Sequence, residues 1–526
     1  MDRIYYSIFN DVLGPIMTGP SSSHSAGCAR IGRTVRDLAG HEILRADVVF
    51  EEQGSYPSTY IGQGSNFGFT GGLLGYAADD PRLKDSVEIA KKEGRSITFQ
   101  KAPLGFLHPN QALIRVYDAQ GNEEMTLMTF SIGGGMFQIT EMDGFPVYID
   151  GGMEQVFILC LSAGAADSVK AYLASLGLPC QETENGSRRL VNVKPPYGTG
   201  TAPLAALRDW ADVAYVRYAK PVLPVVKRQR EIPPFFTSGE ALAFQAKTGT
   251  APWQLALDYE CGYGHVTAEN VWQLAGNVLA AMRGSIVPQV PEPVAEDGFL
   301  AYPAKRMERT PHSSGTVDTG LLQKALLAAV TVMENSCARG IVVAAPTAGS
   351  SGVVPAAVVC VGDQLGRSDE EICKALLTAG LTGVFIANQA TFGGEVGACQ
   401  AENGSASAMA ASGVVQLLGG SAEQCFQAAS LAMQNMLGLI CDPVAGMTEV
   451  PCISRNVSAM SNAILSANMV MLGFDPVIPL DETILTMKDV GQALPAELRC
   501  TCRGGLCTTP TGCRLSDQAS QRHPAL

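Results

Sequence analysis

The stretch "GGSAEQCFQAASLAMQNMLGLICDPVAGMTEVPC", residues 419–452, indicates the fold of the second half of the chain. Ser421, with Gln424 three residues later, fits a capping box, so a helix is predicted to begin there. Apolar residues then recur on one face of this helix, at Phe426, Ala429, Met433, Leu437 and Ile440. The helix is expected to end just before Cys441.

The loop "CDPVAGMTEVPC" (441–452) has a cysteine at each end, and its prolines and glycine stop a helix. Cys399, in the glycine-broken segment "GGEVGACQAENGSASAMAAS" (393–412), completes the spacing C-x41-C-x10-C. Helix ends and glycine-rich loops expose backbone N–H groups, which suit an anionic, thiolate-ligated cluster. C-x-x-C pairs typical of zinc are absent here. The residues alone therefore leave two interpretations open, a metal or iron–sulfur site and buried structural thiols.

Outward from this stretch the same Ala-rich, Gly-broken pattern predicts an all-helical catalytic domain over 238–500. Residues 1–150 mix helices with alternating stretches such as "ALIRVYD" (112–118) and "EMTLMTFSIGG" (124–134), which predict strands of an α+β domain. Segment 153–226 has the order strand, helix, strand, helix, strand, typical of a small ferredoxin-like module. A cysteine-containing tail, 501–526, follows. The fold class predicted is multidomain α+β with a helical C-terminal part.

Composition excludes several classes of function. Hydrophobic residues make up 46% and charged residues 17% of the 526, a balance that favours large buried surfaces and a homo-oligomer. The net charge is −13 without a basic stripe, so no nucleic-acid partner is expected. No apolar run reaches the ~18 residues of a membrane span. The N-terminus resembles no secretory signal, so we expect a cytoplasmic protein whose 15 cysteines are mostly reduced.

Five motifs resemble one known family. They are "GPIMTGPSSSHSAGCARIGR" (14–33), "SIGGGMFQITEMDGF" (131–145), "GIVVAAPTAGSSGVVPA" (340–356), "EVGACQAENGSASAMAA" (395–411) and "LGLICDPVAGMTEVPCISRN" (437–456). The chain is similar along nearly its whole length to the iron–sulfur-dependent L-serine dehydratases, with the family's β and α parts fused. In that family segment 153–226 corresponds to the position of an ACT-like module. Such a module would bind an amino acid or pack subunits together.

The resemblance implies a [4Fe-4S] cluster held by Cys399, Cys441 and Cys452, with one iron open to the substrate. Hydroxide is a poor leaving group and the α-proton is weakly acidic, so elimination needs an electrophile and a base together. The open iron would be the Lewis acid, and a small amino or hydroxy acid the substrate. L-Serine would give pyruvate and ammonia. The alternative cofactor, pyridoxal phosphate, needs a Schiff-base lysine, and no lysine after residue 250 lies beside a Gly-rich phosphate loop.

The same resemblance implies which side chains meet the substrate. Ser21, Ser22, Ser23 and His24 would line the active site, with His24 as the best candidate for the base. The loop "PTAGSSG" (346–352) is interpreted as a substrate-carboxylate loop, formed by Thr347, Ala348, Gly349, Ser350 and Ser351, because its backbone N–H groups can cradle an anion. The plainer alternatives are turns at helix entries for both segments.

Two positions depart from the family pattern. Where the family reads GSFAxTxxGHGTD, this chain reads "GSYPSTYIGQGSN", so Gln63 stands for the histidine and Asn66 for the aspartate. An amide is neutral at physiological pH and cannot act as a base. Three interpretations remain: a serine dehydratase with another base such as His24, an iron–sulfur lyase for a related β-hydroxy or β-thiol acid, and a sensor without catalysis.

The tail adds four cysteines, Cys500, Cys502, Cys507 and Cys513. They are interpreted either as exposed thiols of a flexible end or, from the resemblance, as including one thiol that occupies the open iron before the substrate displaces it.

Overall fold

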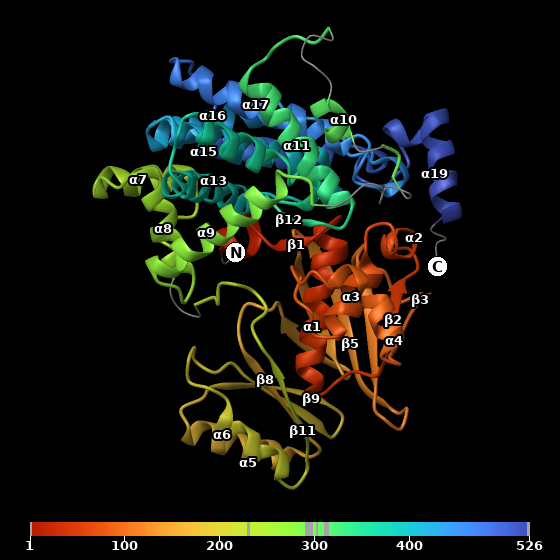
Figure 1. Ribbon diagram of the computed structural model, residues 1–526. Coiled ribbons are helices and arrows are strands. Elements are labelled where there is room, and N and C mark those ends of the chain that lie inside the picture. The colour runs from red at the N-terminus through yellow and green to blue at the C-terminus, as the bar shows by residue number, and fades with distance from the viewer. Residues whose placement is uncertain (1–2, 229–231, 290–297, 301–302, 310–314, 523–526) are drawn as a thin grey trace.

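The computed structural model describes residues 3–228, 232–289, 298–300, 303–309 and 315–522 (Figure 1). A six-stranded sheet with its helices comes first along the chain, a four-stranded sheet follows, and helices form most of the rest. In Figure 1 the helical part lies above and the two sheets lie below it. The predicted fold class, mixed α+β with a helical C-terminal part, is confirmed.

The larger sheet has the strand order β3-β2-β4-β5-β6-β7, and only the β2–β3 pair is parallel. Its strands are β2 (Arg45–Glu51), β3 (Ser96–Ala102), β4 (Gln111–Tyr117), β5 (Glu123–Gly133), β6 (Met136–Met142) and β7 (Phe145–Ile149). The strands predicted at 112–118 and 124–134 are β4 and β5, which pair with each other. Helices α1 (Gly27–Ala39) and α3 (Ser65–Leu73) share a core with this sheet, and α2 (Tyr56–Thr59) and α4 (Ser86–Lys92) complete this part.

The smaller sheet has the order β11-β8-β10-β9, antiparallel throughout. Its elements are β8 (Gln155–Cys160), α5 (Ala163–Ser175), β9 (Cys180–Asn185), β10 (Arg188–Val193), α6 (Ala202–Ala205) and β11 (Val213–Ala219). This is the ferredoxin-like connection of two interleaved strand–helix–strand units. The expected order lacked β9, because "CQETEN" is polar and none of its residues is buried. Strand β9 lies at the sheet edge, where neither face needs an apolar residue.

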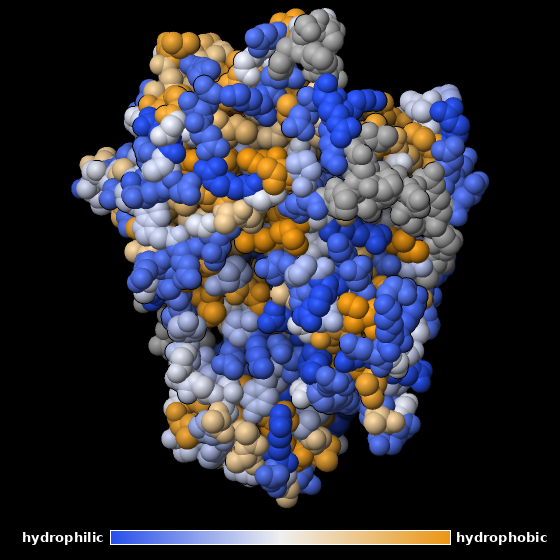
Figure 2. Space-filling view, in the orientation of Figure 1, coloured by the Kyte–Doolittle hydropathy of each residue, from blue (hydrophilic) through white to orange (hydrophobic). Residues whose placement is uncertain are grey.

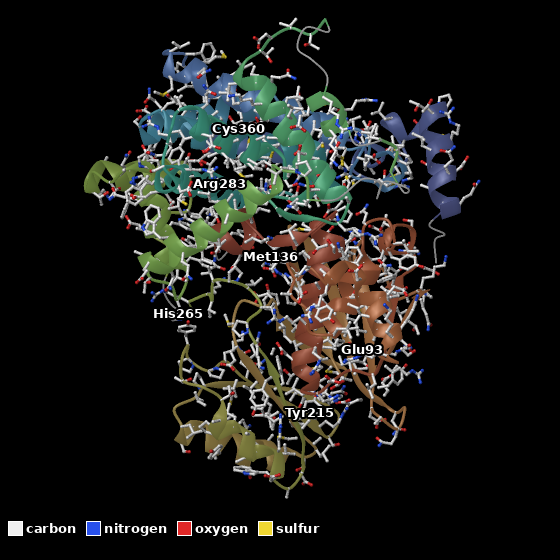
Figure 3. The ribbon with its side chains drawn as sticks, in the orientation of Figure 1. Glu93, Met136, Tyr215, His265, Arg283 and Cys360 are labelled. Atoms are coloured by element: carbon white, nitrogen blue, oxygen red, sulfur yellow. The ribbon has the colours of Figure 1, made fainter. Side chains whose placement is uncertain are left out.

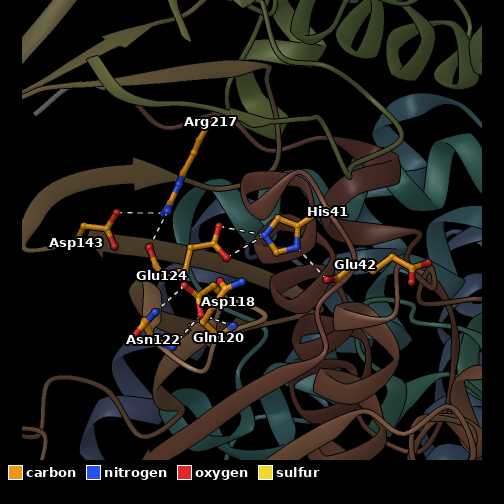
Figure 4. A network of polar contacts seen from close by, with 8 residues as sticks. All are labelled: His41, Glu42, Asp118, Gln120, Asn122, Glu124, Asp143 and Arg217. Atoms are coloured by element: carbon orange, nitrogen blue, oxygen red, sulfur yellow. Dashed lines mark hydrogen bonds and ion pairs between the residues drawn. The ribbon is translucent and has the colours of Figure 1, made fainter. Parts of the chain in front are cut away.

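Polar contacts join the two sheets (Figure 4). The Arg217 guanidinium, on β11, lies 3.1 Å from the Asp143 carboxylate in the turn between β6 and β7, and it also donates to the Glu124 carbonyl at 2.8 Å. Tyr215, two residues earlier on β11, donates to the same Asp143 carboxylate at 2.7 Å. Because Arg217 is almost fully buried, this ion pair is shielded from solvent and should fix the small sheet against the large one.

The helical part is built around α13 (Asp369–Gln389) and α15 (Ser405–Leu417). Helix α15 is buried at every residue except Gln416, because its Ala, Ser and Gly side chains let neighbouring helices approach closely. The surrounding helices are α7 (Ser238–Thr248), α8 (Pro252–Tyr263), α9 (Ala268–Ser285), α10 (Pro303–Arg309), α11 (Leu321–Cys337), α12 (Cys360–Gln364), α14 (Gly394–Cys399), α16 (Ala422–Gln434), α17 (Cys452–Met471) and α18 (Leu480–Ala493). Figure 2 shows polar and apolar side chains mixed over one outer face.

Within the described ranges, no single helix combines the length and the apolar character needed to cross a membrane, although one bent pair, Asp369–Gln389 with Gly394–Leu417, meets both criteria.

Helix α16 confirms the predicted start and corrects the predicted end. Ser421 caps it and forms the capping box with Gln424. The helix stops at Gln434 rather than just before Cys441, because the chain turns at Gly438, whose φ is +82°. A positive φ is open to glycine and costly for other residues. Leu437 consequently lies in the turn and Ile440 in the irregular segment that follows it, and both are only partly buried.

The N-terminal residues pack in the helical core and not with the larger sheet. The short π-helix η1 (Ile8–Val12) places Ile8, Phe9 and Val12 in one buried cluster with α8, α9 and α13. Each such fully buried side chain contributes about 1.5–3 kcal/mol. Strand β1 (Ile16–Thr18) then pairs with β12 (Ile341–Val343), Met17 opposite Val342. The chain therefore crosses from the helical part to the sheet part immediately before Ser21.

Candidate active site

Segments from both halves of the chain meet around one cavity of about 700 Å³. The first half contributes Ser21–His24 and part of the segment 53–63; the second contributes Glu395, Glu402, much of the loop 441–452 and tail residues from Arg499 onward. The β1–β12 pair lies directly before the first of these segments and fixes it against the helical part. A cleft between two parts of a fold, lined by convergent polar groups, is a common form of ligand site.

Three cysteines reach this region from three separate places. Cys399 ends α14, Cys441 opens the loop, and Cys452 begins α17. One ligand atom each from Cys399, Cys441 and Glu402 lie within 4.8 Å of one another. Cys441 and Cys452 both line the cavity, and all three thiols are buried. The structure therefore brings together the cysteines that the sequence spaced 41 and 10 residues apart.

The loop 441–452 is held in a compact bend. Val444 N–H donates to the Val450 carbonyl at 2.9 Å, and Gly446 has a φ of +69°. Asp442, directly after Cys441, forms an ion pair of 2.8 Å with Arg455 on the first turn of α17. Asp442 directly follows Cys441, and Arg455 lies three residues after Cys452, so the ion pair between them helps to fix the separation of the loop's two cysteines.

Charges around the thiols favour a thiolate at Cys399. The hydrogen bond with Cys441 lowers the pKa of the Cys399 thiol to about 7, with the Arg455 guanidinium and the Asn403 amide acting in the same direction. Asn403 Nδ2 lies 3.2 Å from Cys399 Sγ. Thiolates are the ligands of iron–sulfur clusters. Three buried cysteines, two of which line the cavity, form with a neighbouring cation and a carboxyl group a donor set that fits such a cluster.

Glu402 is a site residue that sequence reasoning missed. Its carboxyl is partly buried beside Cys399, and desolvation, followed by the charge of Cys399, raises its pKa to about 8. Thr347 Oγ1 donates to its Oε1 at 2.9 Å. The spacing C-x-x-E, which puts both side chains on adjacent positions of a helical turn, was the signal available in the sequence.

His24 lies at the cavity with both ring nitrogens in contact with hydroxyl groups. Nδ1 is 2.9 Å from Ser23 Oγ, and Nε2 is 3.0 Å from Ser55 Oγ. Ser21 accepts from the His24 N–H at 3.2 Å and thereby caps this turn, while Ser22 also lines the cavity. Burial lowers the pKa of His24 to about 3, so its imidazole is neutral at physiological pH. Ser55 was not among the residues expected from sequence.

Only part of the expected carboxylate loop reaches the cavity. Gly349 lines it, and its carbonyl accepts from Asn456 Nδ2 at 2.8 Å. Thr347 and Ser350 bond to each other through their hydroxyl groups at 3.1 Å. Ser351, fully buried, contacts Met333, and Ala348 belongs to an apolar cluster with residues of the first half. The loop therefore connects α17 to the Cys399 region and presents backbone at Gly349.

The two departures from the family pattern are placed differently. Gln63 lines the cavity, and its Nε2 donates to the Gly446 carbonyl at 2.6 Å, so it bridges the first half of the chain and the cysteine loop. Asn66, on α3, does not line the cavity. Its side-chain oxygen is buried without a hydrogen-bond partner among the described residues.

The tail returns to the cysteine loop. Cys500 N–H donates to the Cys441 carbonyl at 2.8 Å, and Cys441 N–H donates to the Leu498 carbonyl at the same distance. Cys500 and Cys502 line the cavity, and the Cys502 and Cys507 thiols both donate to the Pro443 carbonyl. Helix α19 (Pro510–Arg522) carries the exposed Cys513 and packs near the loop. Residues 523–526 lie outside the described part of the tail.

Comparison with known proteins shows the family that the chain resembles. The family model described as serine dehydratase alpha chain matches residues 182–507. An L-serine dehydratase alpha chain of Peptoniphilus asaccharolyticus is 37% identical over 280 residues, 53% of this chain and 96% of that protein. A probable L-serine dehydratase beta chain of Bacillus subtilis is 42% identical over 155 residues, 30% of this chain and 68% of its own. An L-serine dehydratase of Streptomyces coelicolor is 29% identical over 539 aligned positions, 96% of this chain and 99% of its own.

Proposed function

We propose, since the chain belongs to the L-serine dehydratase family, that it is an ammonia-lyase converting L-serine to pyruvate and ammonia at the cavity between its two halves. One observation carries the proposal. Cys441 and Cys452, which come from separate places in the chain, line the same cavity as His24, and Cys399 lies next to Cys441, with their ligand atoms within 4.8 Å of each other. A β-elimination of water requires a base for the α-proton and an electrophile for the departing hydroxyl; a neutral imidazole can be the base, and thiolates can hold a metal that would be the electrophile.

The proposal includes a [4Fe-4S] cluster held by the three cysteines. When bound, the cluster would supply a Lewis-acidic iron that makes the substrate's β-hydroxyl a better leaving group. The chain's own contribution is to hold the three cysteine ligands in place. Arg455 supports the anionic site by its charge, and its contact with Asp442 keeps the loop bent. Asn456 connects the Gly349 carbonyl to the backbone of Cys452, so the loop 347–351 and the third cysteine are held together.

His24 is the proposed base. Its neutral imidazole leaves one ring nitrogen able to accept a proton, and Ser23 and Ser55 contact the two nitrogens and so fix the ring. With Ser23 accepting from Nδ1–H, Nε2 is the unprotonated nitrogen and accepts from the Ser55 hydroxyl; it would take the substrate's α-proton once that hydroxyl turns away. The enamine that leaves would tautomerise to an imine and be hydrolysed to pyruvate and ammonia.

Glu402 is proposed as the second acid–base group. Its carboxyl lies beside two of the cluster cysteines, and Thr347 holds one oxygen. From that position Oε2 is placed to give a proton to the departing hydroxyl group, while His24 acts from the part of the cavity formed by the first half.

Gln63 bears on the choice of substrate. Its amide bridges to Gly446 and cannot accept a proton at neutral pH, which favours His24 over this position as the base. The second candidate function, elimination from a related β-hydroxy or β-thiol acid, is supported by the same amide, because it lines the cavity where the family pattern has a histidine.

Cysteine variants test the proposal. Protein purified without oxygen should contain iron and labile sulfide, and Cys452→Ser should lose most of both. Cys360→Ser, a half-buried cysteine on α12 away from the cavity, is the matched control and should retain them. Equal iron in the two variants would contradict the assignment of Cys452. Iron without pyruvate from L-serine, but with product from another β-hydroxy or β-thiol acid, would favour the second candidate.

A further inference from the structure

A second cavity, of about 330 Å³, shares no lining residue with the first. It is lined by residues of η1 and β1, of α1 and of α9, by residues 76–79 and by residues 221–224, which follow β11. Met136, labelled in Figure 3, has its sulfur 3.5 Å from Arg30 Nη1 and marks its position. Three parts of the fold therefore meet at this cavity, whose volume is at the lower end of the range for small-molecule sites.

Arg30 is the polar group that needs explanation. Its side chain lines the cavity and is only 6% exposed. Nη1 donates to the Gly135 carbonyl at 2.8 Å, and no ion pair within 4.0 Å joins Arg30 to a carboxylate of the described residues. A guanidinium carries five N–H donors, and a buried charge is costly unless it is paired. Burial lowers the pKa of Arg30 to about 10, although the nearby charges of Asp11 and Asp79 act in the opposite direction.

The other residues of the cavity have complementary character. Arg33 lies one helical turn after Arg30 and also lines the cavity, and Asp79, exposed, lies at its edge. Phe9, Leu13 and Val278 form an apolar wall. The cavity thus has two cations at one side, one carboxylate at its edge and a hydrocarbon surface between the parts that enclose it.

We propose that this cavity binds a free α-amino acid with an aliphatic side chain. Its carboxylate pairs with Arg30 and Arg33, its ammonium group with Asp79, and its side chain contacts the apolar wall. A zwitterion suits this arrangement better than a simple anion, because Asp79 would repel a ligand that carried only negative charge. The site goes beyond the proposed function, since it requires neither the cluster nor turnover.

Calorimetry on the intact chain tests the site, with L-leucine, 4-methylpentanoate and inorganic phosphate as probes. L-Leucine should bind saturably. Arg33→Gln should weaken it by about 10- to 100-fold, the effect of losing a charged hydrogen bond of about 1.5–3 kcal/mol. Arg36→Gln, on the same helix but outside the cavity, should leave the affinity unchanged. Because Arg30→Met removes a buried contact and can impair folding, Arg33 carries the test.

Two further measurements separate the amino acid from other ligands. 4-Methylpentanoate, which lacks the ammonium group, should bind more weakly than L-leucine, and Asp79→Asn should abolish that difference. No heat with L-leucine, or equal affinity in Arg33→Gln and the unmodified chain, would overturn the proposal. Phosphate binding as tightly as L-leucine would overturn it too, as it would identify a simple anion site.

Discussion

Glu260→Gln should change how stability depends on pH. Glu260, on α8, is fully buried and accepts from the Ser7 hydroxyl and, at 2.8 Å, from the Ile8 N–H, so it anchors the N-terminal segment in the helical core. Burial raises its pKa from 4.5 to about 7. Glutamine has nearly the same shape, and its oxygen can keep the bond from the Ile8 N–H. Its amide nitrogen is a donor and replaces the oxygen that accepts from Ser7, whose Oγ already accepts from Phe9 and Asn10 N–H, so that one bond is lost equally at every pH.

The sign follows from which state holds the proton. Below pH 4.5 both states are protonated and Glu260 has no effect. Between pH 4.5 and about 7 the unfolded chain has lost the proton that the folded chain retains, so the free energy of unfolding falls as pH rises. Above about pH 7 the loss is complete. At ~1.4 kcal/mol per pKa unit, the difference between 4.5 and about 7 corresponds to about 3 kcal/mol.

Urea unfolding of the helical part, followed by circular dichroism across pH 4 to 8, measures this effect. The difference in the free energy of unfolding between Glu260→Gln and the unmodified chain should be about 3 kcal/mol more favourable to the variant at pH 8 than at pH 4. Asp11, whose pKa burial raises to about 6, has an effect of the same sign and remains in both proteins. Glu269→Gln, at the start of α9 and exposed, is the control. Equal pH slopes for the unmodified chain and Glu260→Gln would refute the reasoning.

Three other changes test separate contacts. Gln63→Ala removes the amide that donates to the Gly446 carbonyl. It should raise the KM for the substrate, measured by steady-state kinetics, and lower the free energy of unfolding by only about 1 kcal/mol. An unchanged KM together with an unchanged stability would contradict the bridging role. Gly505→Ala, at a φ of +61° and against the Asp442 side chain, should release the tail and speed its hydrogen exchange, whereas unchanged exchange would show that the tail is held elsewhere. Leu472, just after α17, has a side chain that is 88% exposed, and no charged residue lies in the last turn of that helix. Leu472→Asp should therefore weaken the homo-oligomer expected from composition, as measured by light scattering with Lys488→Asp as the control. An unchanged mass would exclude this face from the interface.

Local signals in the sequence were sufficient for the individual elements. The capping box at Ser421 and the strands β4 and β5 follow from residue patterns within ten or so positions, and the structure agrees with them. Strand β9 was missed because an edge strand needs no apolar side, and the end of α16 was misplaced because the turn at Gly438 overrides a continuing apolar period.

Long-range pairing could not be read from the sequence. Nothing in "IMT" (16–18) predicts that it pairs with residues 341–343, yet this ladder positions His24 against the helical part. The insertion of Ile8 and Phe9 into the helical core has the same origin, since apolar residues do not specify which core they join. Motif resemblance, by contrast, pointed to Cys399, Cys441 and Cys452, which local periodicity could not group. Ser55 belongs to neither class of signal, because its role depends on His24, which the fold brings to it. Glu402 had the local signal C-x-x-E, but its contact with Thr347 depends on the fold in the same way.

The central claim is that the cavity is an iron–sulfur site that eliminates water from L-serine. The most direct measurement is pyruvate formation from L-serine by protein purified without oxygen, together with its iron content. About four iron atoms per chain and sustained pyruvate release are the predicted result. Iron-free protein that nonetheless converts L-serine, or cluster-containing protein inactive on L-serine and on related β-hydroxy and β-thiol acids, would contradict the account.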